Sequence, residues 1–242
     1  MMNMFARVSS RITVAAILGL TMLISGTAMA GESGAYTFTV LRDGEPIGSH
    51  WAAFWKDGDR IEIAATSKLK VTFALIPLFE FEHERREIWE KGRPRLIRAN
   101  TVIDGEEFDI TVRRHGRGLI REVNGRVEKL DDAITILALW NKETVTNGRH
   151  SFVSVVEDKK LDLTFTFVGK ETLTVDGKQI ETEHYRMTGD EERDIWYDSQ
   201  GAVVKVEFER RGSRIEYVRN EAELLPAPDR GRIKLAWQKS AR

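Results

Sequence analysis

The chain has 242 residues, with 37 Lys and Arg against 38 Asp and Glu, and it contains no cysteine. This near-balanced charge excludes the basic surface that nucleic-acid binding requires, so nucleic acid is not an expected partner. The lack of cysteine excludes disulfides, thiolate metal sites, a cysteine nucleophile and a lipidated cysteine within this sequence. With 41% hydrophobic residues the chain can bury one core, as single all-β domains of ~200–250 residues do.

The first thirty residues have the pattern of a secretory signal peptide. Arg7 and Arg11 precede an uncharged run over residues 12–24, and Ala28-Met29-Ala30 has the small-x-small pattern of a cleavage site. The apolar run is shorter than the about 20 residues that a membrane-spanning helix needs. We therefore expect cleavage after Ala30, no integral membrane anchor after cleavage, and a soluble protein that is periplasmic or secreted.

Residues 31–223 are predicted to form a single all-β domain. Apolar and polar residues alternate in runs such as 36–40, 61–65 and 204–208, which is the period of a strand with one buried face. Between the runs stand dipeptides that favour tight hairpin turns: Asp43-Gly44, Asp57-Gly58, Asp104-Gly105, Asn124-Gly125, Asn147-Gly148 and Asp176-Gly177. So many strands must curl to bury their apolar face. We predict a strongly curved antiparallel meander that forms an open barrel or clam-like sheet, with at most one or two short helices.

An apolar run over residues 71–79 (VTFALIPLF) is interrupted by Pro77. Because proline cannot donate a ladder hydrogen bond, this run predicts an apolar loop or a sheet edge. We favour a segment that folds over the end of the barrel as a plug. The alternative is an exposed segment that meets lipid or a protein partner.

Residues 79–89 alternate between two kinds of side chain. Glu80, Glu82 and Glu84 share one strand face, which we interpret as a solvated face opposed by basic residues on a neighbouring strand. A carboxylate cluster for metal or substrate is the alternative interpretation. The other face carries Phe79, Phe81, His83, Arg85, Glu87 and Trp89. If this mixed face points inward, it lines a cavity that is part apolar and part polar, as ligand pockets are.

Two later segments depart from the strand pattern. Asp131 and Asp132 precede the apolar run 133–140 and favour a short helix there, since acidic residues stabilise a helix N-terminus; a short strand is the alternative. Residues 224–242 contain two prolines and little periodicity, which predicts a loosely attached C-terminal tail with one short strand at residues 233–237.

Motifs of known chemistry are absent from the sequence. It has no nucleophile elbow, phosphate loop, dinucleotide fingerprint or His-Glu-x-x-His zinc motif, so we assign no catalytic residue, metal site or cofactor. The five histidines lack the spacing of metal ligands, and we expect them at solvated or edge positions. The six tryptophans are expected mainly in the core, with sugar stacking as the alternative.

Four segments resemble the exported bacterial proteins of the DUF6134 family. They are LRDGEPIGSH at residues 41–50, Glu87-Ile88-Trp89 followed by Gly92, Trp140-Asn141, and Asp194-Ile195-Trp196-Tyr197-Asp198 with Gly201. They are more distantly similar to DUF3108 proteins. The resemblance extends over most of residues 36–217. It implies an all-β periplasmic or secreted domain and supplies no catalytic residue.

The leading hypothesis is a non-catalytic binder of an apolar or amphipathic ligand, such as a lipid-like or other envelope component, inside the curved sheet. Its expected contact residues are Trp51, Trp55, Phe73, Leu75, Phe79, Phe81, Trp89 and Trp140. One alternative is an envelope-acting enzyme with acid–base candidates His83, Arg85, Glu87 and His184. Another is a structural or assembly factor that works through its edge strands. The sequence leaves the oligomeric state open.

Overall fold

The computed structural model describes residues 33–73, 76–145, 148–220 and 225–226. The signal peptide, its cleavage site and the strand expected at 233–237 lie outside these residues. The first half of the described chain forms β1 (Gly34–Arg42), β2 (Glu45–Asp57), β3 (Arg60–Phe73), β4 (Ile76–Glu90), β5 (Arg93–Ile103), β6 (Glu106–His115), β7 (Gly118–Val123) and β8 (Arg126–Leu130). The second half forms β9 (Ile134–Ile136), the 3-10 turn η1 (Lys142–Thr144), β10 (Gly148–Val153), β11 (Lys160–Val175), β12 (Lys178–Gly189), β13 (Arg193–Asp198), β14 (Val203–Arg210), β15 (Ser213–Arg219) and β16 (Leu225–Pro226).

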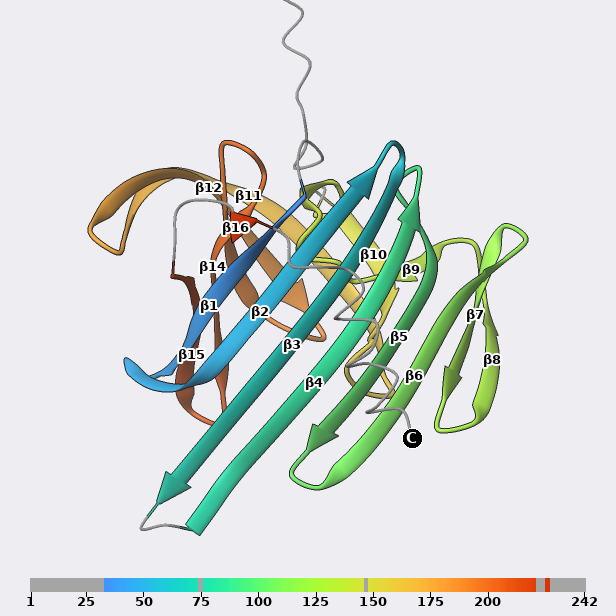
Figure 1. Ribbon diagram of the computed structural model, residues 1–242, viewed down its shortest axis with the longest axis horizontal. Helices are drawn as coiled ribbons and strands as arrows, with labels where there is room; N and C mark the ends of the chain where they lie inside the picture. The colour runs from blue at the N-terminus through green and yellow to red at the C-terminus, as the bar shows by residue number, and fades with distance from the viewer. Residues whose placement is uncertain (1–32, 74–75, 146–147, 221–224, 227–242) are drawn as a thin grey trace, which may run out of the picture.

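The strands form one continuous, strongly curved sheet. Its order is β8-β7-β6-β5-β4-β3-β2-β1-β15-β14-β13-β12-β11-β10-β9, and the short β16 pairs with the start of β1. Neighbours are antiparallel except β9 and β10. Figure 1 shows the first meander, β1–β8 (blue to green), in front and the second meander, β10–β15, behind it. The two ends approach each other, since β7 contacts β9. The predicted curved, barrel-like antiparallel sheet is confirmed.

The predicted hairpin dipeptides set the turns of the sheet. Both residues have positive φ at Asp43-Gly44, Asp104-Gly105, Asn124-Gly125 and Asp176-Gly177. Two successive positive φ angles define the type I′ turn, whose twist matches that of the flanking strands. At Asp57-Gly58 only the glycine has positive φ, and Asn147 lies outside the described residues.

The helix expected over residues 133–140 is wrong. Ile134–Ile136 instead forms β9, in parallel register with Ser151–Val153. The chain then runs irregularly through residues 137–145, which we name the inner segment. Its apolar side chains alternate between the two halves: Ala138 and Trp140 pack with the core of the first meander, whereas Leu137, Leu139 and Val145 pack with the core of the second. A helix would give this segment one apolar face, whereas here it is covered on two sides.

The described residues of the apolar run, 71–73 and 76–79, extend the β3–β4 hairpin and do not form a plug. The last pair of β2 with β3 is Gly48↔Leu69, and the first pair of β4 with β5 is Phe81↔Ile103, so beyond these points β3 and β4 pair only with each other. Pro77 therefore lies beyond the part of β4 that pairs with β5, so its missing N–H group costs no hydrogen bond to β5. The register of β3 with β4 also shifts after Val71. The inner segment, rather than this run, occupies the space between the two meanders.

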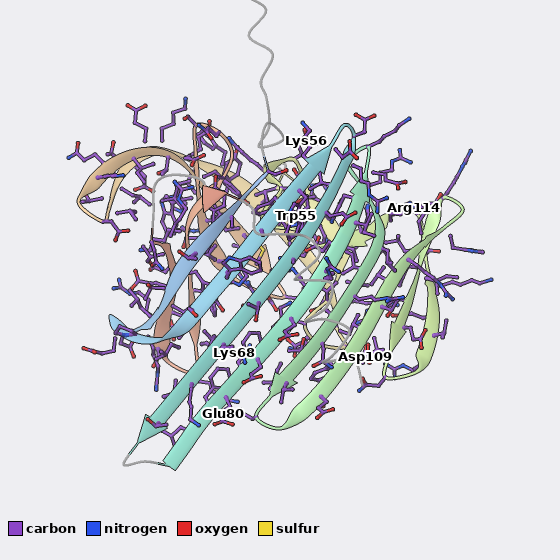
Figure 2. All side chains as sticks on the ribbon, viewed as in Figure 1. Trp55, Lys56, Lys68, Glu80, Asp109 and Arg114 are labelled. Atoms are coloured by element: carbon purple, nitrogen blue, oxygen red, sulfur yellow. The ribbon has the colours of Figure 1, made fainter. Side chains whose placement is uncertain are left out.

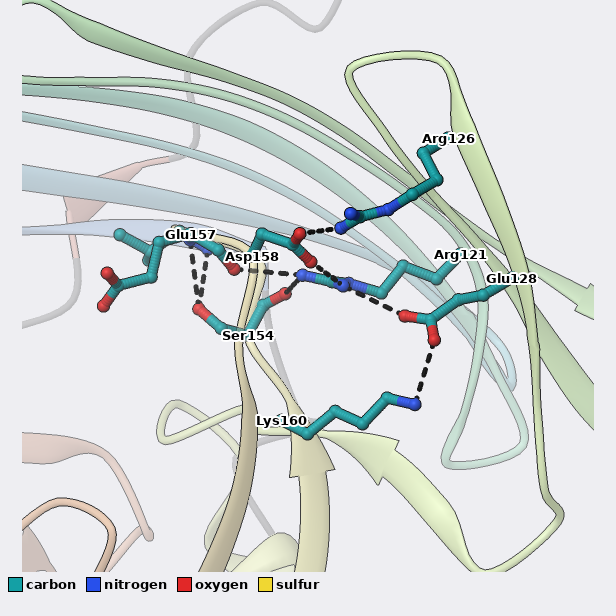
Figure 3. Close-up of polar contacts among 8 residues, drawn as sticks. Arg121, Arg126, Glu128, Ser154, Glu157, Asp158 and Lys160 are labelled. Atoms are coloured by element: carbon teal, nitrogen blue, oxygen red, sulfur yellow. Dashed lines mark hydrogen bonds and ion pairs between the residues drawn. The ribbon is translucent and has the colours of Figure 1, made fainter.

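A buried arginine joins the two free ends of the sheet (Figure 3). Arg121 of β7 is 1% exposed and contacts the β10–β11 loop: its Nη1 lies 2.7 Å from Asp158 Oδ1, and its Nη2 donates to the carbonyls of Ser154 and Glu157 at 3.3 and 3.0 Å. Nη1 also donates to Glu128 Oε1 on β8 at 3.1 Å. One side chain therefore connects the first meander to the second where no strand pairing does.

Among the described residues, the structure has no helix long and apolar enough to cross a membrane.

Candidate functional site

A cavity of about 520 Å³ lies between the two meanders. Its walls come from β1–β5 on one side, from β13–β15 on the other, and from the inner segment and residues 154–157. The lining is mainly aromatic and aliphatic, and includes Tyr36, Phe38, Phe54, Leu69, Val206 and Phe208. This volume and this lining are typical of sites that enclose one small molecule.

One end of the cavity opens to solvent, and we name it the mouth. Leu78, which lines it, is 55% exposed. Arg211 of the β14–β15 turn reaches across to the β5–β6 turn, where its Nη2 lies 3.3 Å from Asp104 Oδ2, and its guanidinium stands 5.7 Å above the Phe79 ring. The strand register places Arg42 and Arg210 near the β14–β15 turn that carries Arg211, and the Arg193 guanidinium stands above the Phe208 ring at the same end. Glu157 and Glu191 also line the cavity. The mouth therefore combines apolar side chains with a mainly basic rim.

The mixed face of β4 points into the cavity, as expected for a pocket wall. Phe79, Phe81, His83 and Arg85 line it in order from the mouth inward. The three rings stack along the strand, with centroids 6.5 and 6.1 Å apart. The opposite face is solvated: Lys70 pairs with Glu80 at 2.5 Å and Lys68 with Glu82 at 3.6 Å, as the labelled Lys68 and Glu80 illustrate (Figure 2).

Two histidines form part of a polar row that crosses four strands. The strand register aligns His50, Ser67, His83 and Thr101 on β2, β3, β4 and β5. His50 Nδ1 lies 2.7 Å from Ser67 Oγ, and His83 Nδ1 lies 2.8 Å from Thr101 Oγ1. The expectation of solvated histidines is therefore wrong for His83, which is 4% exposed. It is wrong because hydroxyl groups on the neighbouring strands satisfy the imidazoles inside the sheet.

Both imidazoles are neutral near pH 7. Burial, aided by the positive charge of Arg85, lowers the pKa of His50 to about 3. Burial first, then Arg85 and His50, lowers the pKa of His83 well below its usual value. His50 keeps some accessible surface, but this surface belongs to the cavity wall. The lowered pKa values follow from the cost of placing charge in an apolar cavity.

A buried ion pair closes the deep end. Arg85 Nε lies 2.8 Å from Glu87 Oε1, although the Nε hydrogen is not aligned with that carboxylate. Glu87 is 2% exposed, and its Oε2 accepts hydrogen bonds from the indoles of Trp89 at 2.5 Å and Trp140 at 3.2 Å. The two indole rings meet edge to face at 5.3 Å. These contacts compensate the Glu87 charge and anchor the inner segment.

The expected contact residues fall into three groups. Phe79, Phe81 and Trp140 line the cavity, and Trp89 packs behind Trp140. Trp51 and Trp55 instead pack with Ala35, Ala53 and Ala64, because the even-numbered residues of β2 face the cavity. The side chain of Phe73 and all of Leu75 lie outside what the structure describes.

The acid–base candidates are divided between two places. His83, Arg85 and Glu87 are neighbours on β4, whereas His184 lies on β12, stacked on Trp196 at 4.5 Å, with Glu171 and Asp194 at its two nitrogens. His50 and Tyr217 are cavity residues that sequence reasoning missed. Because β2 carries apolar side chains on both faces, its alternation gave no signal for His50. Among the described residues, no three His, Asp or Glu side chains are placed to hold a metal ion.

Comparisons with known proteins agree with the fold. The crystal structure of a β-barrel-like protein of the domain of unknown function DUF1849, from Brucella abortus, superposes with a TM-score of 0.58 at 8% sequence identity, covering 78% of this chain and 95% of that chain. Such low identity shows a shared fold alone. No curated protein matches this chain, and the similarity to DUF3108 proteins stays a prediction.

The family comparison accounts for the segments singled out in the sequence. The model of the domain of unknown function DUF6134 matches residues 38–220, a range that includes all four resembling segments and, except for the start of β1, the cavity strands. The chain therefore belongs to the DUF6134 family.

Proposed function

We propose that this protein binds one apolar or amphipathic small molecule in the cavity between its meanders, without catalysis, as an exported and soluble periplasmic protein. The observation that carries the proposal is the cavity of about 520 Å³ with its aromatic and aliphatic lining. Placing apolar ligand surface there would gain roughly 25 cal/mol per Å² removed from water. The signal-peptide pattern of the first thirty residues supports the location.

The polar groups of the cavity support binding rather than catalysis. Glu87, the only carboxylate among the β4 candidates, is enclosed by Arg85 and two indoles. His83 is held by a hydroxyl on the adjacent strand. A general acid or base must reach the proton that it transfers, and Glu87 is shielded from the cavity by its partners. These groups are placed to orient a ligand.

The proposal is tested by filling the cavity. Ala52 is 6% exposed and lines the cavity, so Ala52→Phe places a ring inside it. The control Val127→Phe adds the same ring on β8 at a residue that is 55% exposed. We expect the apolar dye N-phenylnaphthylamine to bind the wild type and Val127→Phe alike, and Ala52→Phe about tenfold more weakly or worse, a loss of about 1.4 kcal/mol.

A second measurement covers the case in which Ala52→Phe does not fold. Protein purified from its native envelope is examined by native mass spectrometry, and we expect an apolar small molecule to remain bound. Protein that is empty in this measurement and does not bind the dye contradicts the proposed function.

A further inference from the structure

Polar and apolar side chains are segregated along the cavity. From the mouth inward, the β4 wall presents Phe79 and Phe81 and then His83 and Arg85. His50 joins these two residues from β2, because the register places it in the same row as His83. We name His50, His83 and Arg85 the polar cluster. Along β4 it lies farther from the mouth than Phe79 and Phe81, toward the end where Trp140 lines the cavity.

The polar cluster presents hydrogen-bond donors and no free acceptor. Thr101 is fully buried, and its hydroxyl contacts His83 Nδ1. The described residues offer that hydroxyl no other acceptor, so it donates to Nδ1, and the proton of the neutral ring stands on Nε2. His83 Nε2 is buried and has no partner among the described residues. The same reasoning applied to the His50–Ser67 contact directs a second Nε2–H group toward the cavity.

Arg85 adds the positive charge of the polar cluster. Its side chain is 17% exposed and lines the cavity, and its contact within the described residues is the Glu87 ion pair through Nε. The two Nη groups therefore remain to bind a ligand. A guanidinium has no acceptor atom and binds a carboxylate in a bidentate manner. A cationic headgroup would find no free carboxylate in the polar cluster.

We propose that the polar cluster is the headgroup subsite of the cavity, and that the ligand is a long-chain carboxylate bound head-first with its chain toward the mouth. This inference rests on the proposed function and adds the ligand class and its orientation. Arg85 is shared with Glu87, and a phosphate dianion would bring one more negative charge to the polar cluster than a carboxylate does, so a monoanion is the better fit. The ligand chain then lies along Phe81, Phe79 and Leu69.

The ligand chemistry is tested on the wild type by displacement of bound N-phenylnaphthylamine. Hexadecanoate, methyl hexadecanoate and hexadecyltrimethylammonium have the same chain and differ at the head. We expect hexadecanoate to bind about tenfold or more tightly than the other two, as expected for hydrogen bonds to a charged group. If the dye binds and the three compounds compete equally, the headgroup subsite is wrong while the proposed function stands. If neither dye nor chain binds, both are wrong.

Variants of the polar cluster locate the effect. Arg85→Gln and His83→Phe should each weaken hexadecanoate about 10- to 100-fold and so remove its advantage over methyl hexadecanoate. Because Arg85→Gln leaves Glu87 uncompensated, the double variant Arg85→Gln/Glu87→Gln removes both charges and serves if the single variant does not fold. Arg98→Gln is the control, since Arg98 is an exposed arginine on β5. Retention of hexadecanoate preference in the double variant overturns the assignment.

The orientation of the ligand in the cavity is tested by quenching of tryptophan fluorescence. Trp140 lies beside the deep end, so its fluorescence reports which end of the ligand arrives there. A stearate with a nitroxide near its carboxylate should quench Trp140 more than a stearate with the nitroxide near its methyl end, and Trp140→Phe should remove the difference. The reverse order of quenching overturns head-first binding.

Discussion

Gly48 lies where the backbones of β2 and β3 approach closely. A Cβ atom at this position would stand 2.0 Å from the carbonyl oxygen of Lys68 and 2.9 Å from Leu69 Cα. These are backbone atoms of a strand paired on both sides, so they cannot move away independently. The glycine of the LRDGEPIGSH segment is therefore explained by interstrand distance rather than by turn geometry.

We predict that Gly48→Ala destabilises the protein by about 1–3 kcal/mol, as overpacking does. Urea unfolding measures the change. Gly169→Ala is the matched control, because nothing lies within 4 Å of its added Cβ; its effect should stay within about 0.5 kcal/mol. Equal destabilisation by the two substitutions would show that the Lys68 contact is unimportant.

Stability should fall as the pH drops below about 6.5. In the folded state burial holds the pKa of His50 at about 3, against 6.5 for the free side chain. Below pH 6.5 the unfolded chain therefore binds a proton at His50 that the folded protein does not bind. The free energy of unfolding decreases progressively from pH 6.5 toward 3. Its slope is about 1.4 kcal/mol per pH unit for each such histidine. The lowered pKa of His83 acts in the same direction.

Urea unfolding between pH 7 and pH 5 measures this loss. We expect about 2 kcal/mol from His50 over that interval, and a further loss in the same direction from His83. His50→Gln should flatten the profile by one such contribution. Asp43 and Glu128, whose pKa values are lowered, lose their contributions only in more acidic solution, so they do not mask the effect. A wild-type profile that is flat from pH 7 to pH 5 would contradict the prediction.

At the scale of elements, the contact between β7 and the β10–β11 loop depends on Arg121. Replacing it with alanine removes the donor for two backbone carbonyls and for Asp158, whose side chain is 31% exposed. We expect Arg121→Ala to cost about 3 kcal/mol, as breaking a buried pair does. Urea unfolding gives the free energy, and hydrogen exchange should show faster exchange in residues 154–159.

Arg126 provides the matched control for this element. It also contacts Asp158, but its side chain is 73% exposed. Because exposed ion pairs contribute little, Arg126→Ala should cost less than about 1 kcal/mol. If the two alanine variants unfold at the same urea concentration, Arg121 does not hold the two ends of the sheet together.

At the scale of the whole molecule, the local part of the fold was predictable from the sequence. Asx-Gly dipeptides and alternating side chains specify hairpins through interactions among neighbours in the chain, and these hairpins are present. The closure of the sheet depends on residues that are far apart in the chain, such as Phe38, which pairs with Arg219. The helix expected at residues 133–140 covers β9 and the first part of the inner segment, and it is wrong because the apolar residues of the inner segment pack against two cores. The linear pattern of apolar residues does not show whether a segment is covered on one side or on two.

The candidate site was predictable only where one strand face is plainly polar. On β4 the glutamates mark the outer face, and Phe79 and Phe81 on the other face line the cavity. On β2 both faces are apolar, with Trp51 and Trp55 on one and Ala52 and Phe54 on the other. Burial on both faces removes the signal that sets strand parity. The large rings of Trp51 and Trp55 led to the expectation that their face lines the cavity, whereas the face with Ala52 and Phe54 does.

The pairing of the first strand with the last full-length strand has a consequence for how the protein is made. Of the described strands, β1 emerges from the ribosome first, yet its partner β15 (Ser213–Arg219) comes about 170 residues later. Until then β1 has an open edge, of the kind that recruits other chains into aggregates. The wall formed by β13–β15 is also missing, so no incomplete chain encloses the cavity. The proposed ligand can therefore be enclosed only after the whole chain has been made.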